Sequence, residues 1–169
     1  MAELSRRERL QPSLLDRLTD RSPEIRRESL DQQTLTMQQL RQAVLRDLAW
    51  LLNTTNLAAT DDLDDVPRAA ASTLNFGVPG FSGMVAASEK VGALEAAIEA
   101  AIRHYEPRIR PDSLHVRARE SRDDNAVPTL VFDIEGELWA QPVPQQLFLE
   151  TSVDIETRLA VVTDKRGRG

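Results

Sequence analysis

The chain has 169 residues, a formal net charge of −6 and no cysteine, and 41% of its residues are hydrophobic. This length and apolar content suit one domain with its own core and an extended terminus. The acidic balance argues against nucleic acid as a partner, and without cysteine the sequence offers no disulfide, no thiolate nucleophile and no cysteine metal cluster.

The amino terminus is rich in charge and shows no apolar targeting segment. The longest apolar run, Leu48 to Leu52, is far too short to span a bilayer. We therefore expect a protein of the cytoplasm with no direct membrane insertion.

Residues 1–33 are predicted to form an extension outside the main domain. Arginine and glutamate surround a small apolar group made of Leu14, Leu15 and Leu18, and Ser13 is suited to cap a short helix there. The group is too small to make a core by itself. It must dock either on the chain's own domain or in the groove of a partner protein.

A long amphipathic helix is predicted to follow this extension. Thr36 and Gln39 have the spacing of a capping box, and apolar residues recur every three or four positions from Met37 to Leu52. A core must therefore cover one side of this helix.

The acidic segment from Asp61 to Asp65 raises the question of a cation site. It lacks the spacing and the distal glutamate of a calcium loop, so we interpret it as a solvated linker. A short helix is expected from Pro67 to Phe76, with Gly77 as its carboxyl-terminal cap. We expect neither a metal nor another cofactor.

Glu106, Pro107 and Arg108 follow a further alanine-rich helix that Ser88 is suited to cap. Pro107 disfavours helical backbone at the residue before it, so this helix is expected to end near Tyr105. A carboxylate at that end has the unfavourable sign for the helix dipole, which invites a functional explanation. The charges would pair with a partner or with an internal counter-charge; alternatively, this is a plain helix end with two solvated charges. As exposed interface groups, Glu106 and Arg108 would each contribute within about 0.5 kcal/mol to the stability of the isolated protein.

After Pro107 the apolar period changes from 3.6 to 2, which is typical of strands with one polar face. Helices followed by strands predict an α+β domain, with amino-terminal helices packed on an antiparallel sheet of three to four strands. We assign residues 34–163 to this domain and expect residues 164–169 to be a disordered basic tail. The predicted strands are 114–119, 130–138, 147–155 and 159–163.

Signals for catalysis are weak. His104 and His115 are the only histidines, and no nucleophile, phosphate-binding or zinc-binding motif occurs. The 27 acidic residues supply many carboxylate pairs, but the sequence marks none as the acid and nucleophile of a glycosidase. Beside Arg108, Glu106 is expected to stay ionised rather than act as a general acid. We expect a protein without enzymatic activity.

Four segments carry a family resemblance: QPSLLDRL at 11–18, VLRDLAWLLNT at 44–54, STLNFGVP at 72–79 and EPRI at 106–109. In this order they resemble the TssE-like baseplate subunits of type VI secretion systems. Those subunits belong to the wider family of baseplate wedge proteins of contractile phage tails, once labelled lysozyme-like. The resemblance extends over residues 10–163.

The resemblance implies a structural role in a cytoplasmic baseplate wedge that is docked at the inner membrane complex. The implied partners are the baseplate subunits TssF, TssG and TssK and the sheath proteins TssB and TssC. The family's fold resembles the sheath domain that links neighbouring sheath subunits through shared strands. A sheet edge is therefore expected to help initiate sheath assembly by strand addition.

The resemblance also implies partner contacts for two groups of residues. The E-P-R motif of the family is a contact surface in the baseplate, and its leader segment suits docking to a partner. The residues that match these two features are Glu106, Pro107 and Arg108, and Leu14, Leu15 and Leu18.

Three other functions stay open at this point. A wedge protein of a phage tail or a related injection machine would have the same fold and different partners. A lysozyme-like peptidoglycan hydrolase and a regulatory relative that binds one adaptor protein would differ in kind. Neighbouring genes for sheath and baseplate proteins would distinguish a secretion system from a phage.

Overall fold

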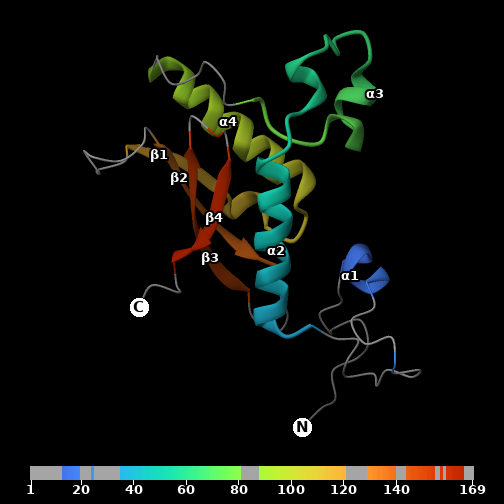
Figure 1. Ribbon diagram of the computed structural model, residues 1–169, viewed down its shortest axis with the longest axis vertical. Coiled ribbons are helices and arrows are strands. Elements are labelled where there is room, and N and C mark those ends of the chain that lie inside the picture. Colours follow the sequence, from blue (N-terminus) through green and yellow to red (C-terminus); the bar gives the residue numbers. More distant parts are fainter. Residues whose placement is uncertain are drawn as a thin grey trace.

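The computed structural model describes residues 13–19, 24, 35–80, 88–120, 129–139, 144–154, 157 and 159–165, apart from the side chains of residues 88–90 and 120. Helices come first along the chain and strands follow, which confirms the α+β class (Figure 1). The helices are α1 (Leu14–Leu18), α2 (Met37–Leu52), α3 (Pro67–Ala70) and α4 (Ser88–Tyr105), with short 3-10 turns η1 (Leu57–Ala59), η2 (Thr73–Asn75) and η3 (Pro111–Ser113). The strands are β1 (His115–Glu120), β2 (Thr129–Leu138), β3 (Gln145–Asp154) and β4 (Ala160–Asp164).

The four strands form one antiparallel sheet in the order β1-β2-β3-β4, so each strand pairs with its neighbours in the chain. Alternating residues are buried along β2 and β3, as the sequence pattern predicted. One face of the sheet is apolar and packs against α2 and α4. The other face carries charged side chains, among them Arg119, Asp133 and Glu150.

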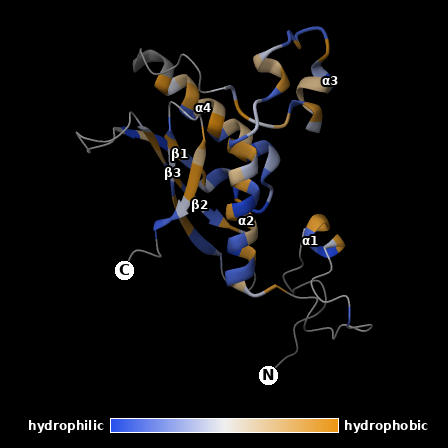
Figure 2. Cartoon of the chain, viewed as in Figure 1, coloured by the Kyte–Doolittle hydropathy of each residue, from blue (hydrophilic) through white to orange (hydrophobic). Residues whose placement is uncertain are grey.

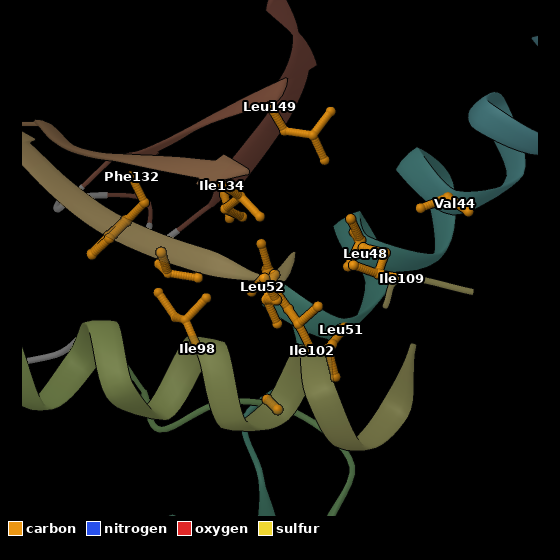
Figure 3. Close-up of a cluster of buried hydrophobic side chains, with 14 of the residues drawn as sticks. Val44, Leu48, Leu51, Leu52, Ile98, Ile102, Ile109, Phe132, Ile134 and Leu149 are labelled. Carbon is orange, nitrogen blue, oxygen red and sulfur yellow. The ribbon is translucent and has the colours of Figure 1, made fainter. Parts of the chain in front are cut away.

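The core fills the space between the apolar sheet face and the two long helices (Figure 3). Spacing of three and four residues gathers the apolar side chains of each helix into one stripe, and alternation gathers those of the strands on one face. Burial of each large aliphatic side chain stabilises the fold by roughly 1.5–3 kcal/mol. The largest contributors include Leu48, Leu51, Leu52, Ile98, Ile102, Phe132 and Ile134.

The ends of the long helices follow the signals in the sequence. The Thr36 hydroxyl accepts a hydrogen bond from the Gln39 N–H at 3.2 Å, and the Gln39 side chain accepts one from the Thr36 N–H at 2.8 Å. This reciprocal pair is the predicted capping box. Helix α2 ends before Asn53, and α4 ends at Tyr105, as the position of Pro107 predicted.

The prediction of one helix from Pro67 to Phe76 is wrong, because the helix in the structure is shorter. Helix α3 ends at Ala70, and a separate 3-10 turn follows. Ser72 lies at the break, where its hydroxyl donates to the Ala69 carbonyl at 2.9 Å and accepts from the Leu74 N–H at 3.2 Å. A serine that bonds the backbone in this way competes with continuation of the helix.

Gly77 has a different role from the predicted helix cap. Its φ of +126° is disfavoured for residues with a side chain, and a Cβ atom there would lie 2.3 Å from the Thr54 carbonyl oxygen. The neighbouring residues Thr55 and Val78 form an isolated parallel bridge. Gly77 therefore allows the loop after η2 to pair closely with the chain that leaves α2.

The acidic segment is solvated as predicted, whereas the carboxyl-terminal strand is longer than predicted. The aspartates from Asp61 to Asp65 are exposed, and the described part of the chain holds no group of side chains suited to bind a metal ion. Strand β4 includes Asp164, and the Lys165 ammonium lies 2.6 Å from an oxygen of Asp133, so the ordered sheet continues past the predicted boundary at residue 163. The remainder of the predicted tail, residues 166–169, lies outside the described residues.

In the described chain no helix is both long and apolar enough to cross a membrane.

Candidate partner-contact site

The corner after α4 is fixed by backbone hydrogen bonds on both sides. The Glu106 N–H still donates to the Ile102 carbonyl at 2.9 Å, which continues the helical pattern by one residue. Beyond Pro107, the Arg108 carbonyl accepts from the Trp139 N–H at 2.7 Å, and the Arg110 N–H donates to the Glu137 carbonyl at 2.9 Å. The corner is therefore attached to the end of β2 by backbone hydrogen bonds.

Glu106 is not a solvated charge. Its residue is only 3% exposed, and its carboxylate accepts hydrogen bonds from the Arg108 Nε at 2.6 Å and from the Arg108 N–H at 3.1 Å. The Arg108 Nη2 bonds the second carboxylate oxygen. The interpretation as an internal ion pair is confirmed, and the interpretation of Glu106 as an exposed group is wrong.

Arg108 also reaches α2, because its Nη2 lies 2.6 Å from an oxygen of Asp47. Burial alone lowers the pKa of the Arg108 guanidinium, but the hydrogen bonds and charges of Glu106 and Asp47 outweigh burial and raise the pKa. The guanidinium is thus held charged between two carboxylates. Its planar fork is suited to such bidentate pairing, and lysine could not reproduce it.

A second arginine extends these contacts to the amino-terminal segment. The Arg46 Nε donates to Asp47 at 2.9 Å, and its Nη1 lies 2.5 Å from an oxygen of Asp16 in α1. The hydrogen bond with Asp16 is the largest influence on the pKa of Arg46 and raises it, whereas partial burial lowers it. Acidic and basic groups alternate along this series, which we call the charged chain: Asp16, Arg46, Asp47, Arg108 and Glu106.

Helix α1 contacts the domain through its polar side while its apolar residues remain outside. Ser13 accepts a hydrogen bond from the Asp16 N–H at 3.4 Å, which is the predicted cap. No residue of α1 is buried, and Leu14, Leu15 and Leu18 are 71%, 48% and 74% exposed (Figure 2). From the sequence, either the chain's own domain or a partner could cover this apolar group, and the described part of the domain leaves the three leucines exposed.

An exposed aromatic residue lies next to the same helix. The Arg46 guanidinium carbon lies 5.0 Å from the ring centre of Trp50, in the geometry of a cation–π contact, and Trp50 is 50% exposed. Because Arg46 also binds Asp16, one guanidinium contacts both the aromatic ring and α1. Exposed apolar groups that gather in one region of a surface are typical of protein contact sites.

Sequence reasoning found one end of the charged chain, Glu106 and Arg108, and missed its other three members. Arg46 and Asp47 follow each other off the centre of the apolar stripe of α2, which is a signal of half-buried positions, but helical spacing cannot show what they bind. Their partners lie 30 and 61 positions away in the sequence. The two histidines take no part, since His104 and His115 are both exposed.

Comparison with known protein families matches residues 38–143 to the family described as baseplate wedge protein gp25. The match covers more than half of the chain and includes Asp47, Glu106 and Arg108. This chain belongs to that family. Helix α1, β3 and β4 lie outside the matched residues, and no curated protein matches the chain. Membership in the baseplate wedge family gives the chain a structural role in a baseplate.

Proposed function

We propose that the chain is a structural subunit of a type VI secretion baseplate wedge in the cytoplasm, docked at the inner membrane complex. It would join the wedge core, made with TssF, TssG and TssK, to the contractile sheath of TssB and TssC, and would help sheath assembly to begin. Membership in the baseplate wedge family and the resemblance of four ordered segments to TssE-like subunits support this proposal.

The charged chain is the observation that carries the proposal furthest. It joins the exposed apolar helix α1 to the E-P-R corner through α2, so two sets of residues expected to contact partners lie on one connected region. Within this region Glu106 is an internal anchor that orients Arg108, while Pro107 is exposed. We assign partner contact to the exposed groups, namely Pro107, the accessible part of Arg108, and the three leucines of α1.

Partner docking of α1 follows from the same geometry. Exposed leucines on a short helix have little stability to gain alone, and burial in a partner groove would supply roughly 1.5–3 kcal/mol for each side chain. The salt bridge between Asp16 and Arg46 would keep α1 near the corner before the partner arrives.

Co-purification tests the proposal most directly. The full chain with a tag is expressed together with TssF, TssG and TssK, and a variant with Leu14, Leu15 and Leu18 changed to alanine is compared with it. We expect the variant to be folded and to lose most of the bound subunits. Leu74→Ala is the matched control, because Leu74 is 71% exposed but lies in η2 and is neither in α1 nor a member of the charged chain. Equal recovery of subunits by all three proteins would contradict the assignment of α1.

The subunits that co-purify with the chain also distinguish a type VI secretion baseplate from the baseplate of a phage tail. A wedge protein of a phage tail would have the same fold and different partners, so it would not recover the type VI subunits. Loss of sheath assembly in cells that lack this protein, followed with labelled TssB, would support the secretion role.

A further inference from the structure

Trp50 lies on the side of α2 that faces away from the core. Its neighbours Leu48, Leu51 and Leu52 are buried, whereas Trp50 is half exposed and takes no part in the hydrophobic core of the described residues. A tryptophan ring offers a large contact area, and tryptophan is enriched among the residues that contribute most to protein binding. The ring is therefore available to a partner, because the fold of the described chain leaves half of it uncovered.

Arg46 holds α1 beside this ring. Arg46 and Trp50 are four positions apart in α2, so their side chains lie on adjacent turns of one helix face. The guanidinium carbon lies 5.0 Å from the ring centre, while Nη1 lies 2.5 Å from an oxygen of Asp16 in α1. A planar guanidinium can stack on a ring and bind a carboxylate at its edge at the same time. One side chain thus fixes where α1 lies relative to Trp50, beside α2 (Figure 1).

The leucines of α1 lie on the side of the helix away from this contact. Successive residues of a helix are about 100° apart, so Leu14 and Leu18 share one side and Leu15 is next to them. Asp16 is on the opposite side, toward Arg46, which agrees with the 12% exposure of its side chain and the exposure of all three leucines. A partner can therefore cover the leucines without breaking the ion pair between α1 and α2.

The charges around the leucines and the ring indicate the chemistry of the partner. Arg17 borders the leucine side of α1, is exposed, and forms no ion pair with another described residue. The charge of Arg46 is already matched by Asp16 and Asp47. Among the described residues, the unmatched charge at this surface is therefore positive, and a carboxylate of a partner would complement it.

We propose that the leucines of α1 and Trp50 form one docking surface, and that Arg46 is the positioning residue that holds the two parts together. The occupant is an apolar groove of a partner protein with a carboxylate at its rim. This inference rests on the proposed role as a baseplate subunit, and it adds a second anchor, its positioning residue and the chemistry of the groove. A second copy of the chain is a poor occupant, because both copies would present Arg17 and keep Asp16 engaged with Arg46.

Energy transfer within the isolated protein tests the arrangement. The chain has two tryptophans and no cysteine, so Trp139→Phe leaves Trp50 as the only donor, and Thr19→Cys provides one site for a dansyl acceptor at the end of α1. We expect efficient transfer, which Asp16→Asn should reduce because α1 loses its ion pair with α2. Asp112→Asn, which removes an exposed carboxylate of η3, is the matched control and should leave the transfer unchanged. Equal transfer in all three proteins would overturn the positioning role.

Recovery of baseplate subunits tests the docking surface. Trp50→Ala in the full chain should lower the recovered TssF, TssG and TssK by about tenfold, the effect of losing an interface anchor. Leu74→Ala is again the matched control, because Leu74 is an exposed apolar residue of η2. Arg17→Glu should lower recovery by about threefold to tenfold, whereas Arg68→Glu, at an exposed position of α3, should leave it unchanged. Trp50→Gln replaces the alanine variant if that variant does not fold.

The possible results separate this inference from the proposed function. If the parent recovers no subunit, the type VI role fails, and energy transfer still tests the arrangement of α1 and Trp50. If the parent recovers the subunits and Trp50→Ala recovers them equally, the docking surface is wrong while the type VI role stands. Dimers of the parent that Trp50→Ala disperses would identify a second copy as the occupant and would also overturn the proposal.

Discussion

Arg108 and Asp47 are 61 positions apart in the sequence, and their Nη2 and Oδ2 atoms lie 2.6 Å apart. This contact joins the corner after α4 to the middle of α2. The two side chains are 22% and 23% exposed, so solvent screens part of their attraction. The contact therefore orients Arg108 more than it stabilises the fold, and it connects the E-P-R corner to Arg46 and α1.

Glu106→Ala is expected to lower the free energy of unfolding by about 1–3 kcal/mol, because a buried acceptor of charged hydrogen bonds is lost and Arg108 keeps only Asp47. This exceeds the value of about 0.5 kcal/mol expected for an exposed position. Chemical denaturation at neutral pH measures the change. Glu99→Ala, at a surface pair on α4, should stay within about 0.5 kcal/mol of the parent. Equal effects of the two substitutions would mean that the Glu106 pair contributes nothing to stability.

Gly77→Ala should destabilise the protein by more than about 2 kcal/mol, because the backbone conformation and the Thr54 carbonyl both exclude a Cβ atom. Gly92→Ala is the matched control, since a Cβ atom there meets nothing within 4 Å. In the helix α4 the control should be neutral or stabilising by up to about 1 kcal/mol. Melting curves of both variants decide the matter, and a tolerated Gly77→Ala would show that the loop can move away from Thr54.

Local patterns in the sequence predicted the elements that depend on periodicity and caps. The capping box of Thr36 and Gln39, the end of α4 before Pro107 and the alternating strands all follow from interactions within a few residues. The same reasoning failed at Ser72, where a side chain that bonds the nearby backbone ends the helix early. Competition between two local bonding patterns is not visible in helix periodicity.

The candidate site could be predicted only in part, because its contacts connect distant positions. The sequence marked Glu106 and Arg108 by the proline between them, and the apolar residues of α1 by their isolation. It did not show that Glu106 is buried, nor that Asp47 and Arg46 join the two groups. Such pairing depends on how α2 packs beside the end of α4, which spacing along one helix does not encode.

Removal of residues 1–33 is predicted to leave the domain folded, because α1 contains no buried residue. The loss of Asp16 removes one partly exposed ion pair of Arg46, which is worth about 1 kcal/mol at most. Thermal unfolding should therefore change little, while co-purification with baseplate subunits should weaken. Collapse of the folded state after truncation would show that the amino-terminal segment belongs to the core.

Purified protein is expected to release no muropeptides from peptidoglycan above a buffer control at acidic or neutral pH. A glycosidase needs one carboxyl group with a raised pKa and a second carboxylate across the bond that is cleaved. The carboxylate of Glu106 is instead hydrogen-bonded to Arg108, its neighbour in the E-P-R corner. Reproducible release that disappears after substitution of a single Asp or Glu would overturn the structural role.

Pro107→Ala tests the contact role of the corner separately from its stability. Pro107 is exposed, and backbone hydrogen bonds to β2 hold the residues that follow it, so the substitution should cost no more than about 1 kcal/mol through the flexibility of the unfolded chain. Pro111→Ala is the matched control, because Pro111 is also exposed and begins the turn η3.

Both proline variants should have similar melting temperatures, and only Pro107→Ala should reduce sheath assembly in cells at equal protein abundance. The reason is that Pro107 is the exposed member of the triplet whose other members are partly or fully engaged inside the protein. If both variants support sheath assembly like the parent, the triplet acts only as an internal brace, and partner contact at the corner must be withdrawn.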